Sequence, residues 1–345
     1  MRILVLGGTV FLSAEIAQQA LDRGHQVTCL ARGTESQPSA GAEFVRGDRN
    51  DGPRSYAGLE GEWDAVVDVS WQPTHVRQAV EALAPRAKHW TYVSSCSVYA
   101  DNSTPGEDES AALQPALESR DDTEVEGSKY GQAKVTCEQI CTSALEGRLH
   151  VCRPGLIGGP GDGSDRFGYW PARFARDNEP VLVPNIPDAP TQTIDVRDLA
   201  GWILTAAENG VTGTLNALGE GISFGRLIRL CQELAESTAP TIWADPAWLV
   251  DNDVAYWSGE HSLPHLLPEG YEGFAARSAE AAVRRGLVRR PVVDILVDIL
   301  EVERRRGLGR ERKSGLSAVT EQLLVERWRR QLAGGPEHDG LEYEI

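Results

Sequence analysis

The stretch "MRILVLGGTVFLSAEIAQQAL" (residues 1–21) decides the fold. An apolar run at its start predicts a buried strand, and apolar residues at helical spacing from about Phe11 predict a helix. Between the two lies the glycine-rich turn 7–9. A strand, such a turn and a helix in this order are typical of a dinucleotide site, where backbone N–H groups and a helix N-terminus face a pyrophosphate. The turn departs from the usual spacing, because Val10 and Ser13 stand where the second and third glycines are expected.

The same alternation continues along the chain. Continuous Val, Ile and Leu runs separated by helical stretches predict a parallel sheet that is covered on both faces. Strands are predicted at 2–6, 26–30, 43–46, 64–69, 88–93 and 149–152, with shorter ones at 181–183, 192–194, 214–216 and 241–243. Helices are predicted near 11–23, 74–84, 128–146, 166–178, 198–209, 223–236, 276–285, 291–305 and 318–331.

This pattern predicts an α/β fold: a Rossmann-type doubly wound parallel sheet with a smaller, mixed C-terminal substrate lobe. The dinucleotide-binding domain is expected at 1–160, with a later segment, about 190–217, returning to it. The substrate-binding or lid lobe is expected mainly at 161–332, followed by an acidic tail at 333–345. The polar stretch 101–127 is a long insertion, which either covers a pocket or forms a surface loop.

Composition limits the partners. The 345 residues include 34 Lys and Arg against 51 Asp and Glu, a net charge of −17. We therefore expect no nucleic-acid and no membrane partner, since both need a basic face, and no apolar run approaches the roughly 20 residues of a membrane span. The six cysteines include no C-x-x-C pair, so buried reduced thiols and no metal site are expected. With no signal peptide ahead of the first strand, we expect a cytoplasmic protein.

Two further motifs carry chemistry. The segment "TYVSSCSVYA" (91–100) is a strand that ends in serines, and "SKYGQAK" (128–134) places Tyr130 and Lys134 four apart on one helix face. A phenol, with an ordinary pKa of about 10, is a poor acid–base group at neutral pH, but a neighbouring ammonium favours the phenolate. Tyr130 can then exchange a proton with a substrate oxygen while hydride moves to or from a nicotinamide. A serine donating to the same oxygen would orient it.

In combination, these motifs resemble the short-chain dehydrogenases/reductases of the extended type, the NAD-dependent epimerase/dehydratase-like superfamily. The similar segments are "VLGGTVFLS", "RGDRND", "YVSSCSVYA", "YGQAK", "RPGLIGGPGD" and "TIDVRDLA", spread over about residues 1–220. The opening is similar to a subgroup with G-G-T-x-F loops, which includes bacterial reductases and plastid stem-loop RNA-binding proteins. The resemblance implies a catalytic triad of Ser95, Tyr130 and Lys134, with Ser94 and Ser97 as alternatives for the serine.

The resemblance also implies a set of cofactor contacts: Gly7, Gly8, Thr9, Val10, Phe11, Leu12, Arg32, Asp48, Arg49, Val69, Ser70, Tyr130, Lys134, Pro154 and Gly155. Asp48 matches an acidic residue that contacts the adenine amine, or is simply a turn residue. NAD sites usually carry an acid at the end of the second strand to hold the ribose 2′-hydroxyl. Here Ala31 occupies that position and Arg32 follows, which favours a 2′-phosphate and hence NADP(H). NAD(H) stays possible, because Glu35 is a candidate late acid.

On the substrate side, the resemblance points to the segment after the sixth long strand. The residues that we predict to contact substrate are Ser97, Arg166, Tyr169, Trp170 and Arg173. An aromatic and basic cluster of this kind suits an anionic or aromatic substrate. It equally suits packing of the lobe, with the arginines in solvent.

We therefore predict an NADP(H)-dependent reductase that acts on a carbonyl or hydroxyl group of a small metabolite. One alternative is a nucleotide-sugar epimerase or dehydratase with tightly bound NAD(P). An alternative of another class is a non-catalytic nucleotide- or RNA-binding protein. A homodimer through the helix of the tyrosine, at 135–145, is a further possibility.

Overall fold

The computed structural model describes residues 1–34, 36–118 and 125–334. Glu35, the middle of the insertion and nearly all of the acidic tail lie outside the described residues, and so do the predictions made for them. Contacts divide the chain into two compact units. Unit 1 comprises Met1–Gly161, Gln192–Gly221 and Glu269–Ile295, and unit 2 comprises Asp162–Thr191, Ile222–Pro268 and Leu296–Ile345.

Unit 1 is built on a seven-stranded sheet in the order β10-β6-β5-β4-β1-β2-β3, in which every pairing is parallel. Its strands are β1 (Arg2–Leu6), β2 (Gln26–Ala31), β3 (Glu43–Arg46), β4 (Ala65–Asp68), β5 (Trp90–Val93), β6 (Leu149–Pro154) and β10 (Gly213–Ala217). The helices of this unit include α1 (Phe11–Asp22), α2 (Pro73–Leu83), α3 (Tyr130–Ala144), α5 (Val196–Glu208) and α8 (Glu280–Arg284). The order reverses between β1 and β4, which confirms the predicted doubly wound α/β fold.

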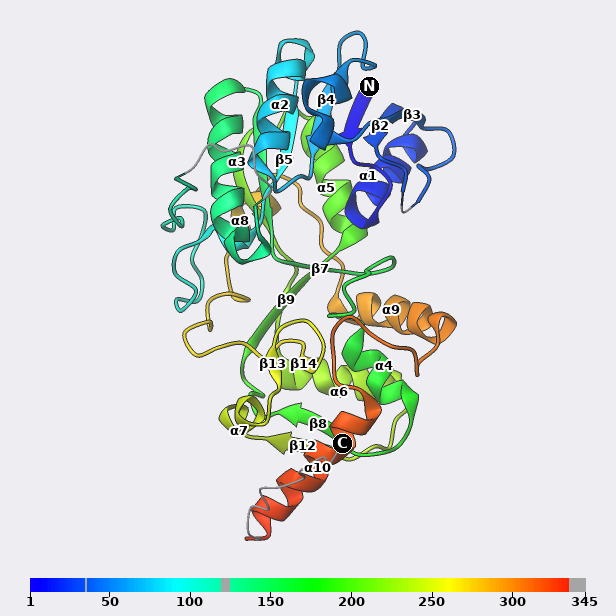
Figure 1. Cartoon of the computed structure of the whole chain (residues 1–345), viewed down its shortest axis with the longest axis vertical. Helices are drawn as coiled ribbons and strands as arrows, with labels where there is room; N and C mark the ends of the chain where they lie inside the picture. Colours follow the sequence, from blue (N-terminus) through cyan, green and yellow to red (C-terminus); the bar gives the residue numbers. More distant parts are fainter. Residues whose placement is uncertain (35, 119–124, 335–345) are drawn as a thin grey trace, which may run out of the picture. The chain divides into compact units, whose positions relative to one another are not determined.

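The two faces of the sheet are covered by different helix pairs. Figure 1 shows α1 beside α5, and α2 beside α3. In β1, Ile3 and Val5 pack into the core that holds α1 and α5, whereas Leu4 and Leu6 pack into the core that holds α2 and α3. Successive strand residues point to opposite faces, so a strand buried on both faces is apolar throughout.

Unit 2 is a smaller mixed assembly. Its helices are α4 (Tyr169–Arg176), α6 (Phe224–Leu234), α7 (Pro246–Asp251) and α10 (Ala318–Leu332), together with most of α9 (Val292–Arg306). Its two-stranded sheets pair β8 (Val181–Pro184) with β12 (Thr241–Ala244), and β13 (Ala255–Tyr256) with β14 (Ser262–Leu263). A further three-stranded sheet contains β7 (Leu156–Gly158), β9 (Pro190–Asp195) and β11 (Gly221–Ser223), of which β7 and most of β9 belong to unit 1. Among the described helices, none combines the length and apolar content that crossing a membrane requires.

A buried ion pair fixes the turn after β3 against the end of β4. Arg49 donates from Nη1 and Nη2 to the two carboxylate oxygens of Asp68, at 2.7 and 2.9 Å, and also donates to the carbonyl of His75 in α2 at 2.7 Å. Burial acts to raise the pKa of Asp68, but the charge and hydrogen bonds of Arg49 hold that pKa below its ordinary value. The pair therefore connects three segments at the carboxyl edge of the sheet.

Replacing Asp68 with Asn should destabilise the protein by about 3–5 kcal/mol, because it leaves the buried guanidinium of Arg49 without a countercharge. Urea unfolding of the purified variant measures this. Asp64→Asn is the matched control at the other end of the same strand, since Asp64 pairs with Lys88, whose side chain is 67% exposed. A control as destabilised as Asp68→Asn would contradict the assigned role of burial.

Candidate active site

The glycine-rich turn is shaped by close approaches of its backbone to neighbouring side chains. Gly7 and Gly8 adopt φ values of +125° and +92°, which favour glycine. A Cβ on Gly8 would lie 2.4 Å from Sγ of Cys29 in β2, whose thiol has its pKa raised to about 11 by burial. The turn therefore requires glycine at position 8 on two independent grounds.

The departures from the glycine pattern are accommodated locally. Ser13 is buried, and its hydroxyl donates to the carbonyl of Val10 at 2.9 Å. A Cβ on Gly7 would meet Oγ of Ser13 at 3.2 Å, so serine fits because Gly7 has no side chain. Val10 is the N-cap of α1 and gives no side-chain cap, with its own side chain 48% exposed. The first-turn N–H groups of α1 are consequently left free of side-chain capping, as an anion site requires.

Next to this turn lies a cavity of about 370 Å³ formed entirely by residues of unit 1. The turns that follow β1, β2, β3 and β4 supply its walls. Eight predicted cofactor residues line it: Gly7, Thr9, Val10, Arg32, Asp48, Arg49, Val69 and Ser70. The other predicted cofactor residues do not line this cavity: Gly8, Phe11, Leu12, Tyr130, Lys134, Pro154 and Gly155.

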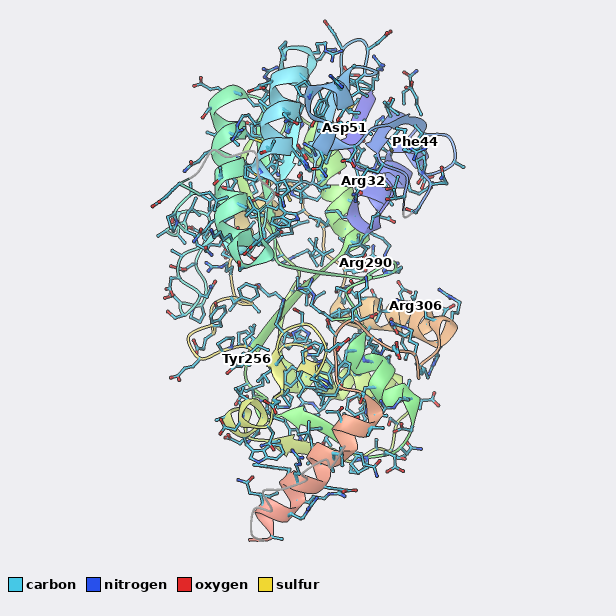
Figure 2. All side chains as sticks on the ribbon, in the orientation of Figure 1. Arg32, Phe44, Asp51, Tyr256, Arg290 and Arg306 are labelled. Carbon is cyan, nitrogen blue, oxygen red and sulfur yellow. The ribbon has the colours of Figure 1, made fainter. Side chains whose placement is uncertain are left out.

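Two residues on the cavity wall bear on the choice of cofactor. Arg32 follows β2 directly (Figure 2) and is exposed, and it makes no hydrogen bond or ion pair within the described part of the chain. Ala31 lines the cavity at the position where an acid is usual. Asp48 both lines the cavity and caps the following turn, accepting from the backbone N–H of Asn50 at 3.0 Å.

The predicted tyrosine and lysine lie on one face of α3. Nζ of Lys134 is 5.9 Å from the ring centroid of Tyr130 and 4.9 Å from that of Tyr92. The ammonium is buried and donates to the carbonyls of Val69, Ser70 and Val93, at 3.5, 3.0 and 2.5 Å. Its three N–H donors thus face three acceptors at the carboxyl ends of β4 and β5.

The three candidate serines have different surroundings. Ser94 is buried, and its hydroxyl donates to Oε1 of Glu138 at 2.5 Å, while Glu138 itself pairs with Arg153 through both carboxylate oxygens. Ser95 and Ser97 are half-buried, and their hydroxyl oxygens are 3.1 Å apart. Ser94 is therefore committed to a buried network, whereas the other two hydroxyls remain accessible.

Three residues that the sequence interpretation did not single out help to build the site. A Cβ on Gly131 would lie 2.3 Å from the carbonyl oxygen of Ser97, so glycine beside Tyr130 lets the serine turn pack against α3. The rings of Trp71 and Tyr130 lie with their centroids 5.6 Å apart and their planes tilted by 57°. Gln72 exchanges two hydrogen bonds with the backbone of Val125, which attaches the described end of the insertion to the cavity wall. For Gly131, the available signal in the sequence was a lone glycine within a predicted helix.

The remaining predicted substrate residues belong to unit 2. The guanidinium of Arg166 lies 5.3 Å from the ring of Trp257. Trp170 is fully buried and donates to the carbonyl of Pro264 at 3.0 Å. Arg173 is also buried, paired with Glu321 at 2.5 Å, and together with Tyr169 it lines a cavity of unit 2. Their contact with a substrate stays a prediction.

All six cysteines are free and buried. Within the ranges that the structure describes, no group of His, Cys, Asp and Glu side chains is placed to hold a metal ion.

A sequence model of the NAD dependent epimerase/dehydratase family matches residues 3–217. The chain belongs to that family. Among curated proteins, this family member is 25% identical over 259 residues to the "Chloroplast stem-loop binding protein of 41 kDa b, chloroplastic" of Arabidopsis thaliana, covering 70% of this chain and 65% of the relative's own length.

Solved structures share the fold of this family member. The NAD-dependent NDP-hexosamine 5,6-dehydratase TunA, involved in tunicamycin biosynthesis, has a TM-score of 0.66 at 17% identity over 89% of this chain and 99% of its own. The UDP-glucuronic acid 4-epimerase of Bacillus cereus, solved with NAD, has a TM-score of 0.61 at 15% identity over the same shares. At these identities the likeness to the solved structures shows the shared fold.

Gly8→Ala should destabilise the protein by about 1–3 kcal/mol more than Gly24→Ala, because overpacking adds to the strain of a positive φ. Gly24 is the matched control: its φ is +79°, but nothing lies within 4 Å of an added Cβ. Thermal or urea unfolding of the two variants measures the difference. Equal destabilisation would show that the contact with Cys29 does not constrain the turn.

Proposed function

We propose that this enzyme is an NADP(H)-dependent reductase that acts on a carbonyl or hydroxyl group of a small metabolite through Ser95, Tyr130 and Lys134. The observation that carries the proposal is the packing of the serine turn on α3 at Gly131, directly beside Tyr130, with the buried ammonium of Lys134 on the same helix face. This arrangement would bring a hydroxyl donor and a phenol to one substrate oxygen.

The proposed chemistry divides between cofactor and protein. A bound nicotinamide would supply or accept the hydride. Tyr130 would give the proton to the substrate oxygen in reduction and take it in oxidation. Ser95 would donate a hydrogen bond to the same oxygen, with Ser97 3.1 Å from it as the second hydroxyl of the turn.

Lys134 would orient the ribose of the nucleotide. An ammonium has three N–H donors, and all three face main-chain carbonyls. A ribose hydroxyl therefore bonds to Lys134 only by replacing one of these acceptors. The carbonyl of Val69 is the one we expect to be replaced, since at 3.5 Å it is the weakest of the three bonds.

The cavity of unit 1 fits a dinucleotide by its donor set. The uncapped start of α1 and the glycine turn would hold the pyrophosphate, while Asp48 would accept from the adenine amine. Arg32 would hold a 2′-phosphate, because it is an exposed guanidinium next to Ala31 where an acid would otherwise repel that group.

Arg32→Ala should weaken NADPH binding about tenfold or more and leave NADH binding unchanged, because a charge-assisted bond to the 2′-phosphate is lost. Fluorescence titration of the purified protein with each nucleotide measures both affinities. The control is Arg46→Ala, which removes an exposed arginine that does not line the cavity. Tighter binding of NADH than of NADPH by the unmodified protein would overturn the assignment.

Two other functions are separable by experiment. In a nucleotide-sugar epimerase the nucleotide would be retained through purification and recycled, so nucleotide released on denaturation would favour that alternative.

The relative named a stem-loop binding protein favours a non-catalytic, RNA-binding role. The net charge of −17 weighs against it. Binding of a stem-loop RNA at physiological salt, with no turnover in a carbonyl screen, would support that role.

Tyr130→Phe should lower kcat by about 10²–10⁴-fold, because it removes the proton donor, and should leave NADPH affinity within about threefold, since the rest of the nucleotide contacts remain. The test follows NADPH oxidation with the best carbonyl found in a screen. The control is Tyr256→Phe, at an exposed tyrosine of unit 2. Full activity of the Tyr130 variant would exclude the proposed acid.

We also propose a cytoplasmic location, a small-molecule substrate without a nucleic-acid or membrane partner, and a homodimer. The apolar residues of the predicted dimer helix, such as Cys137 and Cys141, are buried within unit 1. A dimer through α3 would therefore use its exposed polar side chains, which include Gln139, Thr142 and Ser143.

A further inference from the structure

Helix α3 carries a third buried polar residue on the side that carries Tyr130 and Lys134. Glu138 follows Lys134 by four residues, as Lys134 follows Tyr130, so the three lie along one side of the helix. Glu138 is buried. The proposed reaction uses the tyrosine and the lysine but gives this carboxylate no part.

The carboxylate of Glu138 holds the residue that precedes Ser95. The hydroxyl of Ser94 donates to Oε1 of Glu138 at 2.5 Å, and the N–H of Ser94 donates to the carbonyl of Cys152 in β6 at 2.7 Å. Ser94 is therefore fixed to α3 by its side chain and to the sheet by its backbone. Ser95 comes next and begins the short helical turn Cys96–Val98.

The same carboxylate reaches the other end of this turn through Arg153. In β6, Arg153 donates to both oxygens of Glu138, at 2.9 and 2.6 Å, and from Nη1 to the hydroxyl oxygen of Tyr99 at 3.1 Å. Tyr99 ends the turn, and its O–H donates to Oδ1 of Asn216 at 2.6 Å. Burial raises the pKa of Tyr99 to about 12, so this hydroxyl stays protonated at neutral pH. Glu138 thus connects α3 with both ends of the serine turn.

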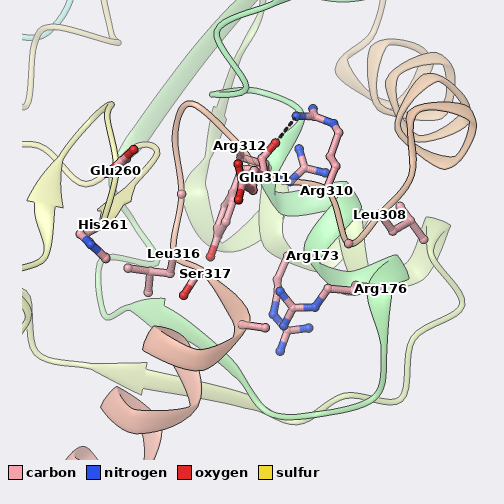
Figure 3. Close-up of a pocket in the computed structure, with 14 residues that line it drawn as sticks. Arg173, Arg176, Glu260, His261, Leu308, Arg310, Glu311, Arg312, Leu316 and Ser317 are labelled. Atoms are coloured by element: carbon pink, nitrogen blue, oxygen red, sulfur yellow. Dashed lines mark hydrogen bonds between the residues drawn. The ribbon is translucent and has the colours of Figure 1, made fainter.

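A buried ion pair of unit 2 shows what differs at Glu138. Glu321 accepts from Arg173 (Figure 3) and also from the backbone N–H of Leu182 in β8. That pair fixes a strand. At Glu138 the donor besides the arginine is the hydroxyl of Ser94, so the pair fixes the serine turn. Since a backbone donor also satisfies a buried carboxylate, burial of Glu138 alone does not require a serine at position 94.

We propose that Glu138 is a positioning residue, which holds the turn of Ser95 in place against Tyr130 on α3. It acts through Ser94 at the start of the turn and through Arg153 at its end. The inference rests on the proposed reductase function, in which a serine and a tyrosine meet one substrate oxygen. A donor stabilises that oxygen only at hydrogen-bond distance, and a misplacement of about 1 Å costs about a hundredfold in rate.

Ser94→Ala is the variant that separates the turn from Glu138. It removes the connecting hydroxyl and keeps the buried ion pair with Arg153, whereas Glu138→Gln would leave that arginine without a countercharge and endanger the fold. The matched control is Ser262→Ala in unit 2. It also removes a buried serine hydroxyl, which donates to the carbonyl of Gly259 at 2.7 Å.

The first measurement is hydrogen–deuterium exchange of the full chain, followed in peptides that cover residues 95–99. Ser94→Ala should speed exchange there about tenfold or more, because loss of a bond to a charged group frees the start of the turn. Ser262→Ala should leave the exchange of these peptides within about twofold of that in the unmodified chain. Unchanged exchange in Ser94→Ala, or equal acceleration in the control, would overturn the positioning role whatever reaction the protein catalyses.

The second measurement is a double-mutant cycle with Ser95, which follows NADPH oxidation with 4-nitrobenzaldehyde as the carbonyl. Ser94→Ala should lower kcat about tenfold when Ser95 is present and less than about twofold in a Ser95→Ala background, because a positioning residue acts through the residue that it positions. NADPH affinity should stay within about twofold, since Ser94 does not line the cavity of unit 1.

The cycle separates failure of this inference from failure of the proposed function. Equal losses of kcat in the two backgrounds would show that Ser94 does not act through Ser95, and would contradict the inference. Full activity of Ser95→Ala, or no turnover by the unmodified chain, would instead contradict the proposed function. The exchange measurement then decides by itself whether Glu138 positions the turn.

Discussion

The arrangement of the candidate active site depends on one buried ammonium. Removing the charge of Lys134 from water is expensive unless hydrogen bonds replace the lost solvation. The carbonyls of Val69, Ser70 and Val93 provide those bonds at the ends of two adjacent strands. Because these carbonyls are fixed by the sheet, they set the position of α3 along its own axis. Tyr130, one turn earlier on the same face, is thereby held at the carboxyl edge, where α/β sheets bind ligands.

Two close approaches of the backbone also fix the arrangement of the site. Gly8 lets the first turn pass against Cys29 of β2, and Gly131 lets the serine turn meet α3. In both places the nearest neighbour would collide with any Cβ. By contrast, Val10 points outward and Ser13 bonds back to the carbonyl of Val10. Glycine is therefore kept at positions 8 and 131, where a neighbour fills the space of a side chain, and a small serine is accommodated at position 13 because Gly7 leaves room for it.

The sequence predicts the long elements because the hydrophobic pattern of each is complete within its own residues. The strands of the central sheet are apolar on both faces, so continuous runs such as 3–6 mark them, and helical spacing marks α1 and α3. The short elements β7, β13 and α7, of three, two and six residues, show no clear period and were not predicted. The pairing of Arg49 with Asp68, and the sequestration of Ser94 by Glu138, join residues 19 and 44 apart in the chain. Such contacts follow from topology, so the residue types alone could not indicate them.

Arginine plays two parts in unit 1 of this acidic chain. A buried ion pair contributes little net stability, because desolvation offsets attraction, but it fixes the orientation of its partners. In unit 1, Arg49 with Asp68 and Arg153 with Glu138 are matched pairs that bind β4 and β6 to neighbouring segments. Their charges are used internally, which leaves the exposed Arg32 as a cation free for a ligand.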